Sequence, residues 1–233
     1  MIFNIYQRVS NIFMLAMDKQ NNMLFIKSGC HPDLYRNEYI MGQKLYNADH
    51  KHFLEPLYYC DQGKFFFFAN KIMYGDSLQR MSDSGWLKKM PNESKMSLIR
   101  DLYQIFTALK NSDIVHRDIR PANLAVFGDT LVLIDFQLAV SKFNYVELES
   151  MNARRLRGLG SRKYRYKMWQ WDDSYSLLKC LSFIGCPSSQ YRKEYQEIYK
   201  EIKSYIGHDT IKSYIREGPF QRLLRHLTKK HKR

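Results

Sequence analysis

The sequence of 233 residues predicts an α+β fold, in which a small strand-rich N-terminal part precedes a mainly helical part. Short apolar and aromatic runs separated by turn residues dominate the first 75 positions, which is typical of strands. From about residue 92 onward, apolar residues recur at the spacing of amphipathic helices. The hydrophobic fraction of 45% and the aromatic fraction of 15% suffice for a buried core and exclude a disordered chain.

The N-terminal part is expected to contain several strands and one helix. The apolar cluster at residues 12–17 is too short for a typical signal-peptide core and is interpreted as a strand. Residues 34–45 place apolar and aromatic side chains at helical spacing. Gly75-Asp76-Ser77 interrupts the pattern and is interpreted as a hinge. The remaining expected strands are 23–26, followed by a hairpin of 53–59 and 65–71 around the turn at 61–63.

The second part is expected to be mostly helical. Asn92 is a candidate cap for a helix that runs to about Leu109. A Gly128-Asp129 turn joins two short strands, and a later helix begins near Asp172 or Asp173. The apolar and aromatic residues expected on the packing face of a last helix are Tyr191, Tyr195, Ile198, Ile202 and Tyr205.

Two nearby segments of this second part carry chemically active residues in a recognisable order. The first reads Ile114-Val-His-Arg-Asp-Ile-Arg-Pro-Ala-Asn-Leu124, and the second reads Leu133-Ile-Asp-Phe-Gln137. The first resembles the protein-kinase catalytic loop, H-R-D-x-x-x-x-N, and the second resembles the magnesium-binding D-F-G. The order of loop, strand, turn, strand and metal aspartate also matches that family. The resemblance extends over roughly residues 5–183 and is strongest in the catalytic loop.

The resemblance implies a set of catalytic and metal-binding residues and the use of ATP and Mg²⁺. Asp118 would orient the acceptor hydroxyl and take its proton, and Arg120 would contact the transferred phosphoryl group. Asn123 and Asp135 would hold Mg²⁺ and, through it, the nucleotide, since hard oxygen ligands suit that ion. Phosphoryl transfer mainly requires positioning and neutralisation of the phosphate charge.

The same resemblance implies two further nucleotide-binding residues and one structural aspartate. Phe25-Ile-Lys27 resembles the V-A-I-K strand, whose lysine binds the α- and β-phosphates. Glu38 lies eleven residues later on the predicted helix, where the partner glutamate of that lysine would be. Asp173 begins a segment that resembles D-x-W-S, and its carboxylate would anchor the backbone of the catalytic loop.

By this resemblance the fold is two-lobed and protein-kinase-like, with a nucleotide-binding N-lobe at residues 1–75 and a shortened, catalytic and acceptor-binding C-lobe at residues 76–233. Three departures from the family are visible. No glycines occur at residues 5–12, where the phosphate-binding loop is expected. Gln137 replaces the glycine of D-F-G and is expected to restrict flipping of that loop. No A-P-E follows, and 60 residues remain after Asp173, so the peptide-binding platform is expected to be reduced.

The net charge of +14 is concentrated in the C-terminal third. Residues 1–150 contain 17 Lys/Arg and 16 Asp/Glu, whereas residues 151–233 contain 20 and 7. Arg154 to Lys167 alone holds seven basic residues and no acidic one, and the C-terminal 229–233 is also basic. Such a field attracts phosphorylated sugars, anionic lipids or nucleic acid, and its plain alternative is a merely soluble basic surface.

The expected function is ATP-dependent transfer of the γ-phosphoryl group to a hydroxyl. A shortened kinase fold with a basic C-lobe is similar to small bacterial kinases of lipopolysaccharide biosynthesis, whose acceptor is an anionic sugar or glycolipid at the membrane surface. A Ser/Thr protein kinase remains open and is favoured by Arg117. A non-catalytic pseudokinase that binds a partner through its basic face also remains open and is favoured by the missing Gly-rich loop. Nucleic-acid binding is the weaker interpretation, because no recognised binding motif is present.

The sequence also predicts a cellular location. No apolar run approaches the length of a membrane span, so no transmembrane segment is expected. The four cysteines form no CxxC pair and are expected to be free thiols in a reducing compartment. The expected location is therefore the cytoplasm, with peripheral attachment at the inner membrane surface.

Overall fold

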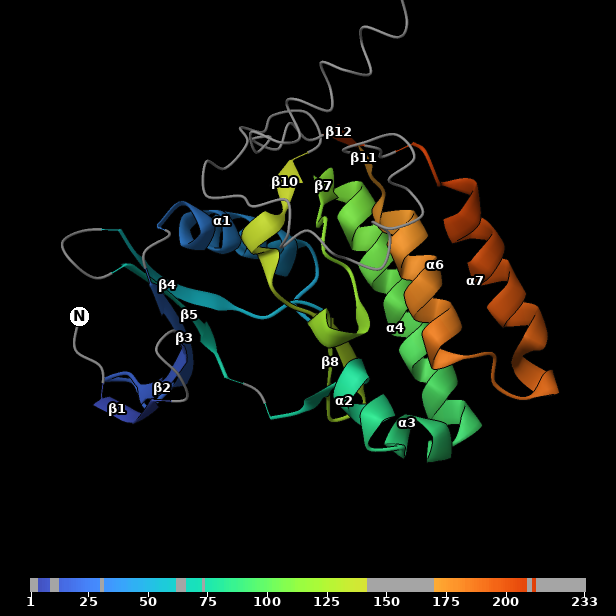
Figure 1. The fold of residues 1–233 in the computed structure, drawn as a ribbon, viewed down its shortest axis with the longest axis horizontal. Helices are drawn as coiled ribbons and strands as arrows, with labels where there is room; N and C mark the ends of the chain where they lie inside the picture. The colour runs from blue at the N-terminus through green and yellow to red at the C-terminus, as the bar shows by residue number, and fades with distance from the viewer. Residues whose placement is uncertain are drawn as a thin grey trace, which may run out of the picture.

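An antiparallel sheet with one helix packed against it precedes a helical part in this chain (Figure 1). The predicted α+β class and the order of its two parts are therefore confirmed. The computed structural model describes residues 4–8, 13–29, 32–61, 66–72, 74–141, 170–208 and 211–212.

The N-terminal sheet has five strands in the order β1-β2-β3-β5-β4, and all neighbours are antiparallel. Every strand predicted for residues 12–71 is present, although Phe53 precedes its strand and forms an isolated bridge with Leu133. A small buried cluster that includes Leu24 and Ile26 forms one face of the sheet. The strands are β1 (Asn4–Arg8), β2 (Phe13–Met17), β3 (Met23–Gly29), β4 (Pro56–Cys60) and β5 (Phe66–Lys71).

The helix α1 (Pro32–Ala48) connects this sheet to the rest of the chain. It packs against β4 and β5 on one side, and against the 3-10 turn η2 (Phe136–Leu138) on the other. Its buried residues include Leu34 and Leu45 at helical spacing, as the sequence predicted, but also the charged Glu38. A buried carboxylate on an otherwise apolar face requires a cation nearby.

The helical part is built around α4 (Asn92–Asn111), which packs against both α6 and α7 (Figure 1). The aromatic residues predicted on the last helix contact this core, as expected from their spacing. The prediction that Asn92 caps α4 is wrong. Pro91 occupies the cap position with an extended ψ of 147°, so Asn92 is already helical. The other helices are α2 (Leu78–Asp83), α3 (Trp86–Lys89), α6 (Asp173–Ile184) and α7 (Arg192–Ser204).

Several short strands follow the N-terminal sheet in the chain and flank the loops that carry the candidate residues. The segment predicted as a hinge forms β6 (Asp76–Ser77), which pairs with β8 and is therefore not an unpaired linker. A Cβ atom at Gly75 would lie 2.0 Å from the carbonyl oxygen of Val126, so only glycine permits this close approach. The remaining strands are β7 (Ile114–Val115), β8 (Leu124–Phe127), β9 (Thr130–Leu133), β10 (Val140–Ser141), β11 (Gln170–Trp171) and β12 (Ile211–Lys212).

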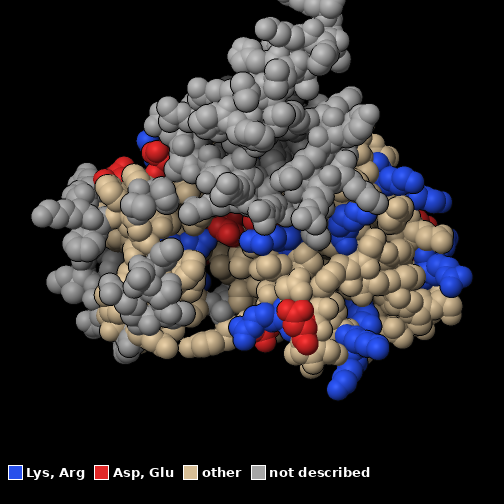
Figure 2. All heavy atoms as spheres, viewed as in Figure 1, with Lys and Arg blue, Asp and Glu red and all other residues tan. Residues whose placement is uncertain are grey.

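The basic segments singled out in the sequence, 154–167 and 229–233, lie outside the described residues, as do positions 9–12 of the expected phosphate-binding loop. Residues 170–208 contain five Lys/Arg and five Asp/Glu, so α6 and α7 contribute nothing to the excess positive charge. In Figure 2 the described Lys and Arg side chains are dispersed over the visible face. Within the described part of the chain, no helix has the length and apolar character needed to cross a bilayer.

Candidate active site

Asp118 lies in the loop between β7 and β8, and its side chain is surrounded by polar groups. The Asn123 amide nitrogen donates to both the backbone oxygen and Oδ2 of Asp118, at 2.9 Å each. The Nε atom of the half-exposed Arg120 lies 3.2 Å from the same Oδ2. Among the described residues, no donor reaches the buried Oδ1 of Asp118. This carboxylate therefore keeps one oxygen available for a hydroxyl proton.

Burial raises the pKa of the Asp118 carboxyl to about 6, although Arg120 lowers it. The negative charge of Asp135 also contributes to the raised pKa of Asp118. Asp118 remains mostly ionised at neutral pH, yet it is a stronger base than an ordinary aspartate.

The backbone of this loop is held by a buried carboxylate from the helical part. Asp173, the first residue of α6, accepts hydrogen bonds from the backbone N–H of His116 at 2.5 Å and of Arg117 at 3.1 Å. Arg117 has a φ of 68°, a left-handed conformation that is costly for a residue other than glycine. The two hydrogen bonds help to hold that conformation, and they are the anchoring contact that the sequence predicted for Asp173.

His116 joins the loop to the strand before Asp135. Burial lowers the pKa of its imidazole to about 4, so the ring is neutral. Its Nε2 donates to the backbone oxygen of Ile134 at 3.1 Å, and its Nδ1 accepts from the Asp118 backbone N–H at 3.2 Å. The ring of Phe136 packs edge-on against it, with 4.9 Å between ring centroids. The segments 114–124 and 133–137, which were singled out in the sequence, are thus in direct contact.

Lys27 on β3 lies between two carboxylates that come from different parts of the chain. Its Nζ atom is 2.6 Å from Oε1 of Glu38 on α1 and 3.1 Å from Oδ1 of Asp135. The Lys27 and Glu38 side chains are buried, at 10% and 1% exposure. The sequence predicted Glu38 as the partner of Lys27 and Asp135 separately as a metal ligand, and the structure places both carboxylates in contact with Lys27.

The charges of this group are unequal, because one cation faces two carboxylates. Burial raises the pKa of Glu38 to about 7, against the attraction of Lys27, which lowers it. Burial opposes the charged form of Lys27, but Asp135 and Glu38 together raise its pKa above the ordinary value. Burial likewise opposes ionisation of Asp135, yet Lys27 holds the pKa of Asp135 below its ordinary value. At pH values above the pKa of Glu38, both carboxylates are ionised and the group carries more negative than positive charge, which suits a further cation.

The oxygen atoms of Asn123 and Asp135 fit a hard metal ion whose remaining ligands come from a phosphorylated molecule. The nitrogen of the Asn123 side chain is turned to Asp118, so its carbonyl oxygen is the atom left for a metal ion. Together with the Asp135 carboxylate this gives oxygen ligands from two residues. Within the described ranges, no cluster of three His, Cys, Asp or Glu side chains could hold a metal ion. Mg²⁺ commonly binds in this way, because it takes its other ligands from water and substrate phosphates.

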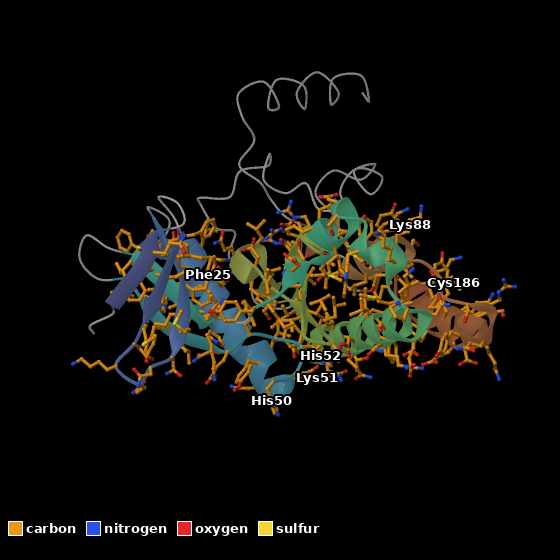
Figure 3. The ribbon with its side chains drawn as sticks, turned by 90° about the horizontal axis from the view of Figure 1, so that it is seen from below. Phe25, His50, Lys51, His52, Lys88 and Cys186 are labelled. Carbon is orange, nitrogen blue, oxygen red and sulfur yellow. The ribbon has the colours of Figure 1, made fainter. Side chains whose placement is uncertain are left out.

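An aromatic pair that the sequence pattern did not indicate lies beside Lys27. Phe25 precedes Lys27 by two positions on β3, so the two share a face of the sheet. Phe13 on β2 is the register partner of Lys27, and its ring stacks on Phe25 with 5.4 Å between centroids and 21° between planes. Figure 3 shows Phe25 on the side of the sheet nearer the helical part.

The candidate residues come from both parts of the chain and meet where these parts join (Figure 1). Lys27 and Glu38 belong to the sheet and its helix. The other four belong to the loops beside the β8-β9 hairpin, and they are Asp118, Arg120, Asn123 and Asp135. A buried lysine, oxygen ligands for a metal ion and a carboxylate with one unpaired oxygen can together position a phosphorylated nucleotide against a hydroxyl.

Comparison with known proteins gives one distant relative and no family match. No protein-family model matches the chain. Over 157 residues the chain is 28% identical to the mitogen-activated protein kinase pmk-3 of Caenorhabditis elegans. The match covers 65% of this chain and 30% of that kinase, so the chain spans less than a third of its relative. The chain is thus distantly similar to part of a protein kinase.

Proposed function

We propose that this chain is an ATP- and Mg²⁺-dependent phosphotransferase that transfers the γ-phosphoryl group to a hydroxyl. The observation that carries the proposal is the contact of Lys27 with both Glu38 and Asp135, beside the hydrogen-bonded pair of Asp118 and Asn123. Distant similarity to a protein kinase supports the same activity. The nucleotide would bind to the N-terminal part, residues 1–75, and the acceptor to residues 76–233.

In this mechanism, the residues mainly position the reactants and compensate charge. Lys27 would bind the nucleotide phosphates, while Asn123 and Asp135 would hold Mg²⁺, which neutralises phosphate charge when bound. Asp118 would accept the proton of the acceptor hydroxyl through its unpaired Oδ1. The hydroxyl oxygen then forms its bond to the γ-phosphorus, the bond to the β–γ bridging oxygen breaks, and ADP leaves. Arg120 would pair with the transferred group in place of Asp118.

As acceptor we propose an anionic saccharide of the bacterial lipopolysaccharide core. The support is the positive charge of residues 151–233, which contain 20 Lys/Arg and 7 Asp/Glu. Residues 170–208 contain equal numbers of both kinds and contribute none of this surplus. The surplus therefore falls on the segments around them, including 154–167, which follows the candidate metal loop in the chain. Each Lys or Arg near an anionic surface contributes about 1 kcal/mol, screened by salt. Such a stretch would hold the enzyme at the cytoplasmic face of the inner membrane.

A Ser/Thr protein kinase is the second candidate, and the similarity to a protein kinase favours it. A pseudokinase that only binds a partner is less well supported. The buried contact of Lys27 with Glu38 and the unpaired oxygen of Asp118 favour a reaction over it, because groups with perturbed pKa values cluster at functional sites.

The acceptor can be identified by offering the protein two substrate classes with radiolabelled ATP. One arm contains purified lipopolysaccharide core, and the other contains casein and myelin basic protein. The Asp118→Asn variant reports the background in each arm. A triple variant, Arg162→Gln, Lys163→Gln and Arg165→Gln, is compared with a charge-matched control that changes Lys88, Lys89 and Arg192 to Gln.

Label on the core sugar that falls with added salt and in the first triple variant, but not in its control, is the expected result. Label on the protein substrates alone would overturn the saccharide acceptor and favour the protein kinase. No label in either arm, with ATP still bound, would favour the pseudokinase.

A further inference from the structure

The side-chain amide of Asn37 on α1 lies against the backbone of the loop that follows Asp135. Its Nδ2 donates to the carbonyl oxygens of Phe136 at 3.3 Å, Gln137 at 3.1 Å and Ala139 at 2.6 Å. An amide nitrogen has two hydrogens, so two of these three carbonyls share one of them. These carbonyls belong to a single 3-10 turn and its cap, where the backbone offers few partners of its own.

The backbone of this loop has an unfavourable conformation that the contact with Asn37 helps to hold. Asp135 has a φ of 71°, a conformation that a non-glycine residue keeps only when its surroundings impose it. Its carboxylate contacts Lys27, which also binds Glu38. Asn37 precedes Glu38 on α1, so one turn of that helix binds both the lysine and the backbone beyond Asp135.

The chemistry of the contact requires an amide at position 37. Three carbonyl oxygens converge on one atom, so that atom has to be a donor and carry no negative charge. A carboxylate of the same shape would repel all three oxygens, and an apolar side chain of the same size would leave them without this partner. Asn37 itself is half-buried, which limits replacement of the lost contacts by water.

We propose that Asn37 is a positioning residue for the metal-binding loop. It holds the turn after Asp135 against α1 and thereby keeps the Asp135 carboxylate where a Mg²⁺–nucleotide complex would bind. The inference rests on the proposed function for its purpose, but the clamp itself can be measured in the protein without any acceptor. The backbone oxygen of Gln137, which replaces the glycine of D-F-G, is one of the three acceptors.

The test compares Asn37→Asp and Asn37→Leu with the matched changes Gln43→Glu and Gln43→Leu. Gln43 is an exposed amide on the same helix, and its Nε2 donates to the neighbouring Tyr39 hydroxyl at 2.8 Å. Hydrogen exchange of the backbone amides at residues 136–141 is measured in the free protein. The Mg²⁺ concentration that half-saturates the ADP-bound protein is measured by calorimetry, together with the thermal unfolding midpoint.

Both Asn37 variants are expected to speed exchange at residues 136–141 by about tenfold, the scale of losing one or two net hydrogen bonds. The half-saturating Mg²⁺ concentration should rise by a similar factor, with little change in either quantity in the Gln43 variants. Exchange that equals the controls would overturn the clamp. Faster exchange with unchanged Mg²⁺ affinity would overturn the positioning role and leave a structural one.

Failure of the proposed function has a different signature from failure of this inference. A wild-type protein that binds Mg²⁺ and ADP but transfers no phosphate to any acceptor would refute the transfer reaction alone, and the Asn37 comparison would still be decided by exchange and Mg²⁺ affinity. A wild-type protein that binds no Mg²⁺ with ADP would overturn both.

Discussion

The Nζ atom of Lys27 lies 3.1 Å from the Oδ1 atom of Asp135, although 108 residues separate the two in the sequence. The contact brings the sheet and the candidate metal loop together. Because Glu38 binds the same ammonium at 2.6 Å, Lys27 keeps a partner when a metal ion competes for Asp135. The group is therefore arranged to exchange one cation contact for another without leaving a buried charge unpaired.

Nucleotide and metal binding should depend on the Asp135 carboxylate. ATP with Mg²⁺ should raise the unfolding midpoint of the wild type, because a ligand at 100 times its Kd adds about 2.7 kcal/mol of stability. Asp135→Ala should lose most of this shift, whereas Asp129→Ala, in the exposed turn before β9, should retain it. Thermal unfolding with and without EDTA measures the effect, and equal shifts in the two variants would remove Asp135 from the metal site.

The transfer reaction should depend on the basicity of Asp118. Asp118→Asn keeps the shape of the side chain and can still accept from Asn123, but it cannot take a hydroxyl proton. We expect turnover to fall by about two or more orders of magnitude, with a smaller change in nucleotide affinity. Asp113→Asn is the matched control, since Asn tolerates the left-handed φ of 53° at that position. Turnover near the wild-type value in Asp118→Asn would transfer the role of base to another group.

A histidine between two carboxylates should make the stability of the chain depend on pH. His52 lies four residues after the end of α1, and its side chain contacts α4 (Figure 3). Its Nδ1 lies 2.5 Å from Asp49 Oδ2, and its Nε2 lies 3.0 Å from Asp101 Oδ1 on α4. The other charged group at this position is Lys51, 3.0 Å from the same Asp101 oxygen, and the backbone N–H of Leu131 on β9 donates to Asp101 Oδ2. Both nitrogens of the ring therefore face acceptors, which favours the imidazolium.

Burial lowers the pKa of His52, but the hydrogen bonds and charges of Asp101 and Asp49 raise it more, to a value above the ordinary 6.5. A group whose pKa is raised in the folded state stabilises fully below its unfolded pKa, and this stabilisation is lost as pH rises through the folded pKa. We expect the free energy of unfolding to decline above pH 6.5. His52→Gln should destabilise by about 3 kcal/mol at pH 6, the scale of a broken buried pair, and flatten this decline.

The matched control for this experiment is His50→Gln, because His50 is exposed and only two positions away. Its pH dependence of unfolding should follow the wild type. Denaturant titrations between pH 6 and pH 9 measure the comparison. A decline above pH 6.5 that persists unchanged in His52→Gln would show that another group is responsible.

Local sequence patterns were sufficient for much of the fold and for the identity of the candidate residues. Strands and helices follow from periodicity, because each repeats on the scale of a few residues. Asp118 and Asn123, five positions apart, are predicted as candidate residues because their segment resembles a kinase catalytic loop, and that resemblance is also local in the sequence. The predicted cap of α4, Asn92, lies one residue after the observed cap, Pro91. Either residue can precede a helix, and local patterns define helix ends only to within one or two residues.

Contacts between distant segments could not be predicted in this way. Asn37 is an ordinary polar residue in the sequence, and only the packing of α1 against η2 makes its amide the donor to three carbonyls 99 to 102 positions away. The stacking of Phe13 on Phe25 likewise depends on the register of β2 against β3. Neither contact leaves a local spacing that a pattern could detect.

The sequence by itself determined the α+β order of the chain and the uneven distribution of charge, since both are carried by residue identity and short-range spacing, and its resemblance to protein kinases predicts the six candidate residues. The tertiary structure decided that Lys27 contacts two carboxylates, that His52 is enclosed between two more, and that Asn37 faces the loop after Asp135. The physical reason is that burial and proximity set the strength of electrostatic and hydrogen-bonding interactions, and these arise only when distant segments pack together.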